Sequence, residues 1–516
     1  HPTLLLNNRD FHRFITDGID VAVHRNGADL TEKLWLIDQN NIQNNNFLAV
    51  NQFTVIEGNH NKRPDIVVFI NGIPMVVFEL KSSSNEHVGI TEAYNQLETY
   101  KETIPSLFRT NAFLVISDGV NARVGTITSS EEWFTMWRSM DGQELAPSSL
   151  PQLEVLIRGM FKYETLIDII SHFILFQEDD QNIIKILAAY HQYYAVNKAI
   201  EKTHQAINGD RKIGVIWHTQ GSGKSLTMLF YSGKVVLEAD NPTIVVITDR
   251  NDLDGQLFNT FSKSPDILRQ EPAQAESKEH LKELLSVDSG GVVFTTIQKF
   301  APEDGEDSLE TYTDRKNVIV IADEAHRSQY GFEAAVSKGR TKGQLKYGFA
   351  KYLRDALPNA SFIGFTGTPV ELEDKNTPAV FGNYIDVYDM TQAVEDGATV
   401  RIYYESRIIK LDVSEDELHE LDQELEELTE GQELEESARL KTKWSRLEAL
   451  AGADNRLQRL AQDIVEHFEK RQEAMFGKGM IVVMSRRIAI ELYKEIIKLR
   501  PEWHSDDDDK GVIKTV

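Results

Sequence analysis

Residues 214–229 constrain the fold of this chain more than any other part of its sequence. The apolar residues 215–217 predict a buried strand, the loop His-Thr-Gln-Gly-Ser-Gly-Lys-Ser (218–225) follows, and an apolar helix then begins. This order is typical of a phosphate-binding loop, in which glycines and a helix N-terminus direct several backbone N–H groups at one anion. The stretch therefore predicts a site for a nucleoside triphosphate.

Individual residues of this loop are expected to contact the phosphates and the Mg²⁺ ion of the bound nucleotide. Lys224 is expected to reach the β- and γ-phosphates, and the Ser225 hydroxyl to bind Mg²⁺. His218 stands where the pattern usually has its first glycine, but the inner Gly-x-Gly-Lys-Ser is intact. The alternative is a glycine-rich turn with an incidental lysine. The predicted ATP-binding residues of the loop are Thr219, Gln220, Gly221, Ser222, Gly223, Lys224 and Ser225.

From residue 214 onward, short apolar runs alternate with helical patterns. Their near-continuous, mostly β-branched character predicts the strands of a parallel sheet that is buried on both faces. Polar residues follow each run, at the sheet edge where such folds bind their ligands. The runs are residues 243–248, 292–294, 318–321 and 362–364.

Two of these polar groups extend the predicted nucleotide site. Asp323 follows an apolar strand and is expected to bind the Mg²⁺ through water, while Glu324 is placed to polarise the attacking water. His326 and the run Thr366-Gly367-Thr368 are expected to couple the nucleotide state to a bound nucleic-acid strand. Asp-Glu-Ala-His alone can occur by chance. Its place after a strand and downstream of the loop indicates that it belongs to the nucleotide site.

Length and composition limit the class of protein. At 516 residues the chain predicts about three to four domains. The absence of cysteine excludes disulfides and thiolate zinc sites and suits the cytosol, and no apolar run approaches the ~18 residues of a membrane helix. The chain starts at His1-Pro2 without a methionine, which indicates numbering that begins inside a longer gene product.

The acidic charge of the chain is unevenly distributed. Net charge is −26, but residues 411–440 alone hold thirteen acidic residues and one basic residue. The rest is only mildly acidic, so local basic grooves for nucleic acid remain compatible with the composition. Leucines spaced along residues 415–436 predict an exposed helical insertion rather than a specific docking surface.

A hairpin is predicted in the first unit, between residues 65 and 81. Two β-branched runs flank Asn71-Gly72, a strong signal for a two-residue turn. Antiparallel pairing brings the end of the second run back to the start of the first. We therefore expect Asp65 to lie beside Glu79 and Lys81, which share one face of their strand.

Two carboxylates and an ammonium group at one hairpin end suit metal-dependent phosphodiester hydrolysis. Asp65 and Glu79 can hold one or two Mg²⁺ ions, and Lys81 can orient or deprotonate water or stabilise phosphate charge. The pattern resembles the PD-(D/E)xK nucleases. Ordinary ion pairs at strand ends are the alternative.

The sequence after the hairpin supports a nuclease core. Residues 86–103 predict a helix that carries Gln96 and Tyr100 on one face, and strands are expected at 113–117 and 122–127. The Gln-x-x-x-Tyr pair resembles a further motif of the nuclease domain in type I restriction subunits. An ordinary helix face is the alternative.

Together the motifs identify a family resemblance. His-Thr-Gln-Gly-Ser-Gly-Lys-Ser, Asp-Glu-Ala-His-Arg-Ser-Gln and Gly-Phe-Thr-Gly-Thr-Pro resemble superfamily 2 translocase motifs. With the nuclease-like hairpin N-terminal to them, the chain resembles the restriction (R) subunit of type I restriction–modification enzymes. The resemblance implies ATP-dependent translocation and cleavage of unmodified double-stranded DNA, with ATP and Mg²⁺ as cofactors. It also implies modification (methyltransferase) and specificity subunits as partners, and the cytoplasm of a bacterium or archaeon.

The expected fold class is α/β, in four parts. They are a PD-(D/E)xK nuclease-like domain at 1–150, a helical linker at 151–207, a RecA-like ATPase lobe at 208–390, and an incomplete second lobe with the acidic insertion at 391–516. Residues 479–484 are expected to form a strand of that second lobe. In superfamily 2 helicases a glutamine upstream of the loop often reads adenine, and Gln192 is the candidate, with a surface glutamine as the alternative.

Two other functions remain open from the sequence. One is a superfamily 2 repair or RNA helicase with a degenerate nuclease domain, which ATPase stimulation by RNA would favour. The other is an ATP-binding scaffold or switch module. Glu324 argues against this second function, because a pure switch needs no water-activating carboxylate.

Overall fold

The structure is a computed structural model. In it the chain forms two compact units, His1–Arg401 and Ile402–Val516. It describes residues 3–25, 28–82, 88–179, 182–248, 254–300, 309–325, 335–336, 345–346, 349–368, 376–406, 454–507 and 509–515.

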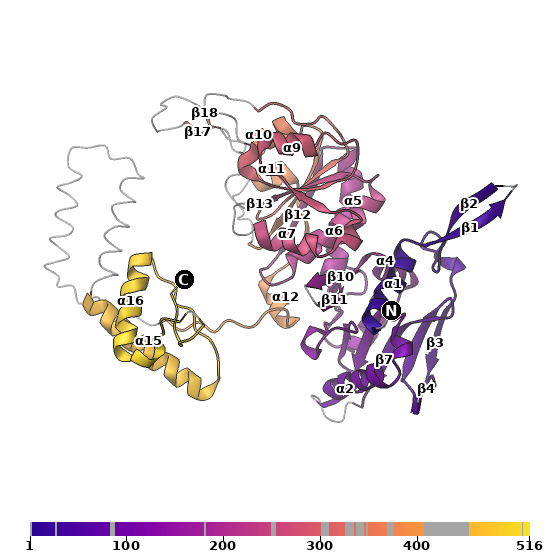
Figure 1. The fold of residues 1–516 in the computed structure, drawn as a ribbon, viewed down its shortest axis with the longest axis horizontal. Coiled ribbons are helices and arrows are strands. Elements are labelled where there is room, and N and C mark those ends of the chain that lie inside the picture. The colour runs from indigo at the N-terminus through magenta and orange to yellow at the C-terminus, as the bar shows by residue number, and fades with distance from the viewer. Residues whose placement is uncertain are drawn as a thin grey trace. The chain divides into compact units, whose positions relative to one another are not determined.

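The N-terminal part of the first unit is built on a five-stranded sheet (Figure 1). Its central hairpin turns at Asn71 and Gly72, whose φ angles of 53° and 80° suit a tight two-residue turn. The predicted hairpin is therefore confirmed. Only β7 and β8 pair in parallel, on either side of the crossover helix α2, and the other neighbours are antiparallel. In spatial order the strands are β3 (Phe47–Asn51), β6 (Ile66–Ile70), β7 (Ile73–Leu80), β8 (Phe113–Ser117) and β9 (Ala122–Gly125), and the helix is α2 (Val88–Thr103).

Two ribbons and a helix accompany this sheet. Strands β1 (Ile19–Arg25) and β2 (Ala28–Leu34) form a two-stranded ribbon that projects from the body in Figure 1. Strands β4 (Val55–Glu57) and β5 (His60–Lys62) form a shorter one between β3 and β6 in the sequence. Helix α1 (Leu4–Thr16) begins at Thr3, whose side chain accepts a hydrogen bond from the Leu6 backbone.

The segment predicted to be a helical linker contains a hairpin as well as helices. Helices α3 (Gln152–Met160), α4 (Tyr163–His172) and α5 (Tyr190–Ile207) are present, but strands β10 (Ile174–Asp179) and β11 (Asn182–Leu187) pair between α4 and α5. The wholly helical prediction is wrong here, because short apolar runs do not distinguish a strand from a buried helix by periodicity.

A seven-stranded, all-parallel sheet forms the rest of the first unit. The strands predicted from the apolar runs at 215–217, 243–248, 292–294, 318–321 and 362–364 are confirmed. The added edge strands, β14 and β20, lack a long apolar run. In spatial order the sheet is β14 (Pro272–Gln274), β15 (Val292–Thr296), β13 (Thr243–Thr248), β16 (Val318–Ala322), β19 (Ser361–Thr366), β12 (Lys212–His218) and β20 (Tyr384–Tyr388).

Both faces of this parallel sheet are buried. On β13, Ile244 and Val246 belong to one hydrophobic cluster, whereas Val245 and Ile247 belong to another. Helices supply the remaining walls of these clusters (Figure 1). They are α5, α6 (Lys224–Glu238), α7 (Asp254–Ser262), α8 (Pro265–Leu268), α9 (Lys278–Leu284), α10 (Phe349–Ala356), α11 (Asn376–Phe381) and α12 (Met390–Glu395), and a short ribbon is formed by β17 (Ala335–Val336) and β18 (Leu345–Lys346).

One hydrophobic cluster joins the N-terminal sheet to the parallel sheet. It includes Ile70 and Phe113 of the first sheet, Phe173 of the intervening segment, and Phe230 and Ile363 of the parallel-sheet lobe, all fully buried. The N-terminal domain and the lobe are therefore packed as one body rather than connected by a free linker.

The second unit contains a helical pair. Helices α15 (Asp454–Ala474) and α16 (Arg486–Leu499) pack through a small apolar cluster, and Arg500 binds both carboxylate oxygens of Glu469 at 2.6 and 2.7 Å. The acidic insertion predicted at 415–436 lies outside the described residues.

The strand predicted at 479–484 does not form. These residues have no regular secondary structure, and Met480 and Val482 are 87% and 84% exposed. A strand requires a neighbour that satisfies its backbone groups. The described residues of this unit contain no strand with which it could pair. No helix in the described part of the chain is long and apolar enough to cross a membrane.

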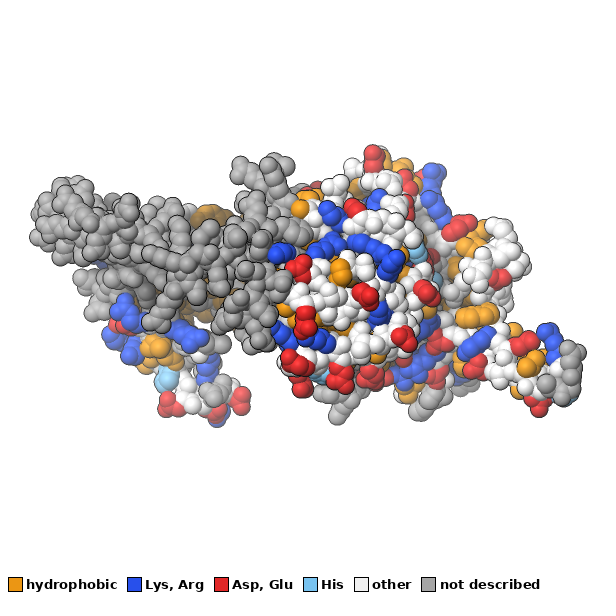
Figure 2. Space-filling model, turned by 90° about the horizontal axis from the view of Figure 1, so that it is seen from above, with side chains coloured by type: hydrophobic (Ala, Val, Ile, Leu, Met, Phe, Trp, Pro, Cys, Tyr) orange, Lys and Arg blue, Asp and Glu red, His pale blue; other side chains and the backbone are white. Residues whose placement is uncertain are grey.

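Charges of both signs are mixed on one face of the described surface (Figure 2). On the face seen in Figure 2, Lys and Arg side chains lie among Asp and Glu side chains rather than in one large patch of a single sign. The net charge of the chain therefore does not describe its local surface.

Candidate functional site

The three residues predicted at the hairpin end lie together. Asp65 precedes β6, and its Oδ2 accepts a 2.8 Å hydrogen bond from the backbone N–H of Leu80, at the end of β7. Glu79 is only 3% exposed, and the Nζ of Lys81 donates a 2.7 Å hydrogen bond to its Oε1. The hairpin register thus assembles two carboxylates and one ammonium group from residues up to sixteen positions apart (81 − 65).

The Glu79 carboxyl is buried beside one like charge and one opposite charge. Burial raises the pKa of its carboxyl, the neighbouring Asp65 raises it further, and Lys81 opposes both effects. Its Oε2 is buried without a well-aligned hydrogen-bond partner in the described structure. A buried carboxylate oxygen of this kind is costly unless a partner such as a cation satisfies it.

The donor set fits Mg²⁺ rather than a metal held only by protein. No group of three or more His, Cys, Asp or Glu side chains with metal-site geometry occurs among the described residues. Mg²⁺ usually keeps several waters and takes one or two carboxylates together with substrate phosphate. Asp65 and Glu79 match that requirement.

Tyr100 of α2 lies beside the same carboxylates, and Gln96 of that helix interacts with Tyr100. Tyr100 is 5% exposed, and burial, followed by the negative charge of Glu79, raises its pKa to about 12. A hydrogen bond from Gln96 acts in the opposite direction. Of the predicted pair, Tyr100 therefore faces the carboxylates, and Gln96 reaches them through Tyr100.

The phosphate-binding loop connects β12 to α6. Gly221 and Gly223 have φ angles of 82° and 80°, which favour glycine, and Gly223 caps the N-terminus of α6. The Ser222 hydroxyl donates to the Thr219 carbonyl at 2.6 Å, and the Thr219 N–H donates to the Tyr388 carbonyl at 2.9 Å. The loop is thus held by its own hydrogen bonds and by strand β20.

The two acidic residues that follow β16 reach the loop lysine. Glu324 Oε1 lies 3.8 Å from Lys224 Nζ, and the Glu324 backbone N–H donates to Asp323 Oδ1 at 2.9 Å. Burial, together with the charge of Glu324, raises the pKa of Asp323 to about 6, and Lys224 opposes this. Glu324 has a φ of 50°, an uncommon conformation for a residue with a side chain.

The Thr366-Gly367-Thr368 run also lies next to Lys224, through Gly367. A Cβ atom at Gly367 would lie 2.4 Å from Lys224 Nζ, so the absence of a side chain there leaves room for the lysine. Thr366 and Thr368 hydrogen-bond to one another through Oγ1 of Thr366. His326 lies outside the described residues.

Gln192 lies against the loop, but both ends of its amide contact backbone. Its Oε1 accepts from the Ala189 N–H at 2.9 Å and its Nε2 donates to the Gly223 carbonyl at 3.1 Å. At 4% exposed it is not a surface glutamine, so that alternative is wrong. It caps α5 and positions the loop, and its contact with adenine stays a prediction.

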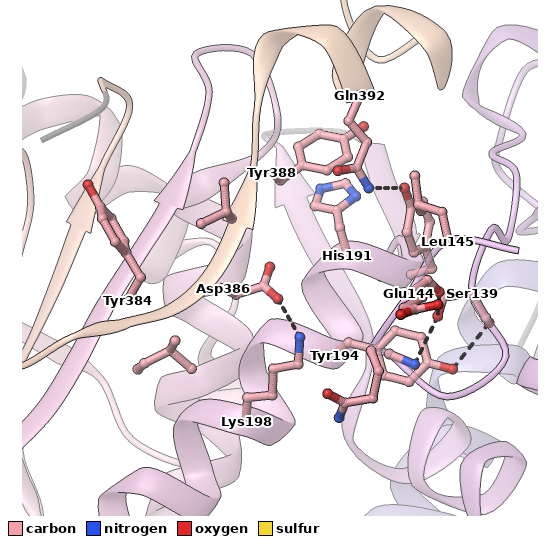
Figure 3. A pocket seen from close by; sticks show the side chains of 15 residues that line it. Ser139, Glu144, Leu145, His191, Tyr194, Lys198, Tyr384, Asp386, Tyr388 and Gln392 are labelled. Carbon is pink, nitrogen blue, oxygen red and sulfur yellow. Dashed lines mark hydrogen bonds and ion pairs between the residues drawn. The ribbon is translucent and has the colours of Figure 1, made fainter.

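Several residues around the loop were not predicted from the sequence. His218 Nε2 lies 3.0 Å from Asp386 Oδ2, and Lys198 Nζ donates to Asp386 Oδ1 at 2.8 Å. Burial opposes ionisation of Asp386, but His218 and Lys198 hold its pKa below the usual value. Figure 3 shows the Lys198–Asp386 pair in a cavity of about 280 Å³ between α5, β20 and the loop around Ser139. No sequence pattern pointed to Asp386, because β20 was not predicted as a strand.

Two family models match the chain, and known proteins are similar to it. The chain matches the SWI2/SNF2 ATPase family over residues 191–438 and the type I restriction enzyme R protein N-terminus family over residues 2–133. It is 47% identical, over 99% of its length, to the type I restriction enzyme HindI endonuclease subunit of Haemophilus influenzae. The chain is therefore similar, over nearly its whole length, to the endonuclease subunits of type I restriction enzymes. The resemblance inferred from the motifs is confirmed.

Each of the two sites of this chain falls within one matched region. The carboxylate hairpin lies in the R protein N-terminal region, and the phosphate-binding loop lies in the ATPase region. The chain spans 48% of the HindI subunit and 48% of a subunit assigned to the MjaIXP enzyme of Methanocaldococcus jannaschii, to which it is 36% identical over 96% of its own length. It thus spans about half the length of the curated relatives it matches.

A solved structure also matches most of the chain. It is a fragment assigned to an HsdR subunit of a type I restriction enzyme from Vibrio vulnificus YJ016. The two are 17% identical with a TM-score of 0.36, over 88% of this chain and 72% of that one.

Proposed function

We propose that the protein is the motor and nuclease subunit of a type I restriction complex, which translocates and cleaves unmodified double-stranded DNA at the expense of ATP. Modification and specificity subunits would be its partners, in the cytoplasm of a bacterium or archaeon. The observation that carries the proposal is the presence, in one packed unit, of a carboxylate–lysine hairpin and a phosphate-binding loop with adjacent acidic residues.

For ATP hydrolysis, we assign binding of the β- and γ-phosphates to Lys224 and the loop backbone. Ser225 and Asp323 would hold the Mg²⁺, and Glu324 would orient the attacking water and accept its proton. The 3.8 Å approach of Glu324 to Lys224 supports this, because it places the carboxylate beside the group that binds the terminal phosphate. Thr366, Gly367, Thr368 and His326 would transmit the nucleotide state to DNA.

For cleavage, we assign metal binding to Asp65 and Glu79 and activation of the attacking water to Lys81. When bound, Mg²⁺ supplies a Lewis acid that polarises the scissile phosphate. The ionised form of Glu79 is the ligand, and its contact with Lys81 favours that form. Tyr100, oriented by Gln96, would fix the Glu79 side chain from the other side.

The domain boundaries remain part of the proposal. We propose a nuclease domain at 1–150, a connecting segment at 151–207, a first RecA-like lobe at 208–390 and the start of a second lobe at 391–516. Support comes from the two sheets, whose described strands fall within the first and third of these ranges.

The decisive experiment uses the full-length protein in a complex reconstituted with its modification and specificity subunits. We expect Lys81→Ala to lower ATP-dependent cleavage of unmodified plasmid by about 100-fold or more, since it removes a proton-transfer group, while ATP hydrolysis stays near wild type. Lys224→Ala should abolish both activities. Lys33→Ala, a lysine on the projecting ribbon, is the control and should change neither. Unimpaired cutting by Lys81→Ala would remove the nuclease assignment.

A further inference from the structure

Asp65 is held differently from the other residues of the carboxylate site. Glu79 is fixed by burial within a central strand, whereas Asp65 is partly exposed and lies just before β6. Packing alone does not set the rotation of its side chain. Hydrogen bonds must do so.

Three hydrogen bonds hold Asp65, and two of them come from Gln52. The Gln52 backbone N–H donates to the Asp65 carbonyl at 2.8 Å, and its Nε2 donates to Oδ1 at 2.8 Å. The third is the bond from the Leu80 N–H to Oδ2, also 2.8 Å. Each carboxylate oxygen therefore has one donor and keeps a lone pair for another ligand.

The backbone at Gln52 is unusual. Its φ is 50°, in the left-handed region that favours glycine, directly after β3 pairs with β6 at Asn51 and Ile66. Strained conformations that the surrounding structure enforces are concentrated at functional sites. Glycine would adopt this backbone conformation with less strain. Unlike glycine, however, the long amide side chain of Gln52 can also donate a hydrogen bond to Asp65.

We propose that Gln52 is a positioning residue of the nuclease site, which fixes the Asp65 carboxylate in the orientation that binds the divalent cation with Glu79. This inference rests on the proposed nuclease function. A neutral amide suits the role, because it donates a hydrogen bond without cancelling the negative charge that attracts the cation. A lysine at this position would compete with the metal.

The test measures cleavage by the reconstituted complex as a function of Mg²⁺ concentration, with ATP hydrolysis followed in the same reactions. We expect Gln52→Ala to raise the half-saturating Mg²⁺ for cleavage about three- to tenfold and to lower the maximal rate, because the carboxylate is less well oriented. The Mg²⁺ dependence of ATP hydrolysis should not move. Comparison of the two Mg²⁺ dependences therefore distinguishes an effect on the metal of the nuclease site from an effect on the metal bound with ATP.

Two further variants separate positioning from general stability. Gln52→Gly removes the amide and also relieves the left-handed strain, so it should unfold no more easily than wild type and still show the Gln52→Ala defect. Gln39→Ala also loses one glutamine hydrogen bond to the protein, from Nε2 to the Ile15 carbonyl at 3.1 Å, but has no link to the carboxylates. It should leave the Mg²⁺ dependence of cleavage unchanged.

The outcomes distinguish this inference from the proposed function. Wild-type cleavage and Mg²⁺ dependence in Gln52→Gly, beside an inactive Lys81→Ala, would overturn the role of Gln52 alone. Full cleavage by Lys81→Ala would overturn the nuclease function itself. An equal defect in Gln39→Ala would show that only stability had been measured, and would also overturn the inference.

Discussion

Gly367 lies where a side chain would displace the loop lysine. A Cβ there would lie 2.4 Å from Lys224 Nζ, the mobile end of a long side chain. We expect Gly367→Ala to lower ATP hydrolysis about 10- to 100-fold, since small misplacements of a positioning group have effects of this size. Its free energy of unfolding should stay near wild type, because the lysine can move. Gly255→Ala, where a Cβ meets no atom within 4 Å, is the control and should hydrolyse ATP normally.

The raised pKa of Asp323 predicts a pH-dependent stability of the metal-free protein. Its folded pKa of about 6 exceeds the reference value of 3.8, so its stabilising contribution is complete below about pH 4 and is lost as pH rises through 6. Asp323→Asn should therefore be more stable than wild type at pH 8, by roughly 1–3 kcal/mol at about 1.4 kcal/mol per pKa unit. Urea unfolding in EDTA between pH 4 and pH 8 measures this; an advantage that grows on acidification would contradict it.

Residues of the carboxylate site differ in how readily the sequence reveals them. Asp65, Glu79 and Lys81 were predictable, because a two-residue turn fixes the register of a hairpin and thus the partner of each residue. Gln52 was not, because it lies 13 positions before Asp65 and glutamine has no preference for the left-handed conformation it adopts.

At the scale of elements, strand β20 packs on β12 at a glycine. Gly214 has a φ of 139°, and a Cβ there would lie 2.3 Å from Ile385 Cγ1 and 2.7 Å from the Asn383 carbonyl oxygen. We expect Gly214→Ala to lower the free energy of unfolding by about 1–3 kcal/mol, because the backbone at Asn383 and the partly buried side chain of Ile385 would both have to move. Urea unfolding beside Gly255→Ala, which should be unchanged or slightly stabilised, checks this. A loss of equal size in Gly255→Ala would contradict it.

Elements were predictable where burial on both faces gives an unbroken apolar run. Strands β13, β15, β16 and β19 meet this condition, and each was predicted. Strand β20 carries Asp386 and two tyrosines, so its pattern is interrupted, and it was missed. Residues 479–484 show the opposite error, since their apolar run predicted a strand for which no described neighbour exists.

At the scale of the whole molecule, residues 1–401 should fold without the remainder. The three largest hydrophobic clusters lie within this unit, whereas the helical pair of the second unit has a cluster of its own. A chain that ends at Arg401 is therefore expected to unfold cooperatively in urea with a midpoint close to that of the main transition of the longer chain. Near-ultraviolet circular dichroism measures the transition. Loss of the cooperative transition would show that residues 402–516 are required.

The hydrophobic cluster that joins the two sheets also has a mechanical consequence. Ile70 of the carboxylate hairpin and Ile363 of β19, in the parallel sheet, belong to one continuous core, so the two sites lie on one packed body. Under the proposed function, we therefore expect cleavage not to be switched by a swing of the nuclease toward the motor. We expect the arrival, tension or looping of the DNA at a fixed cutting position to decide when cleavage occurs.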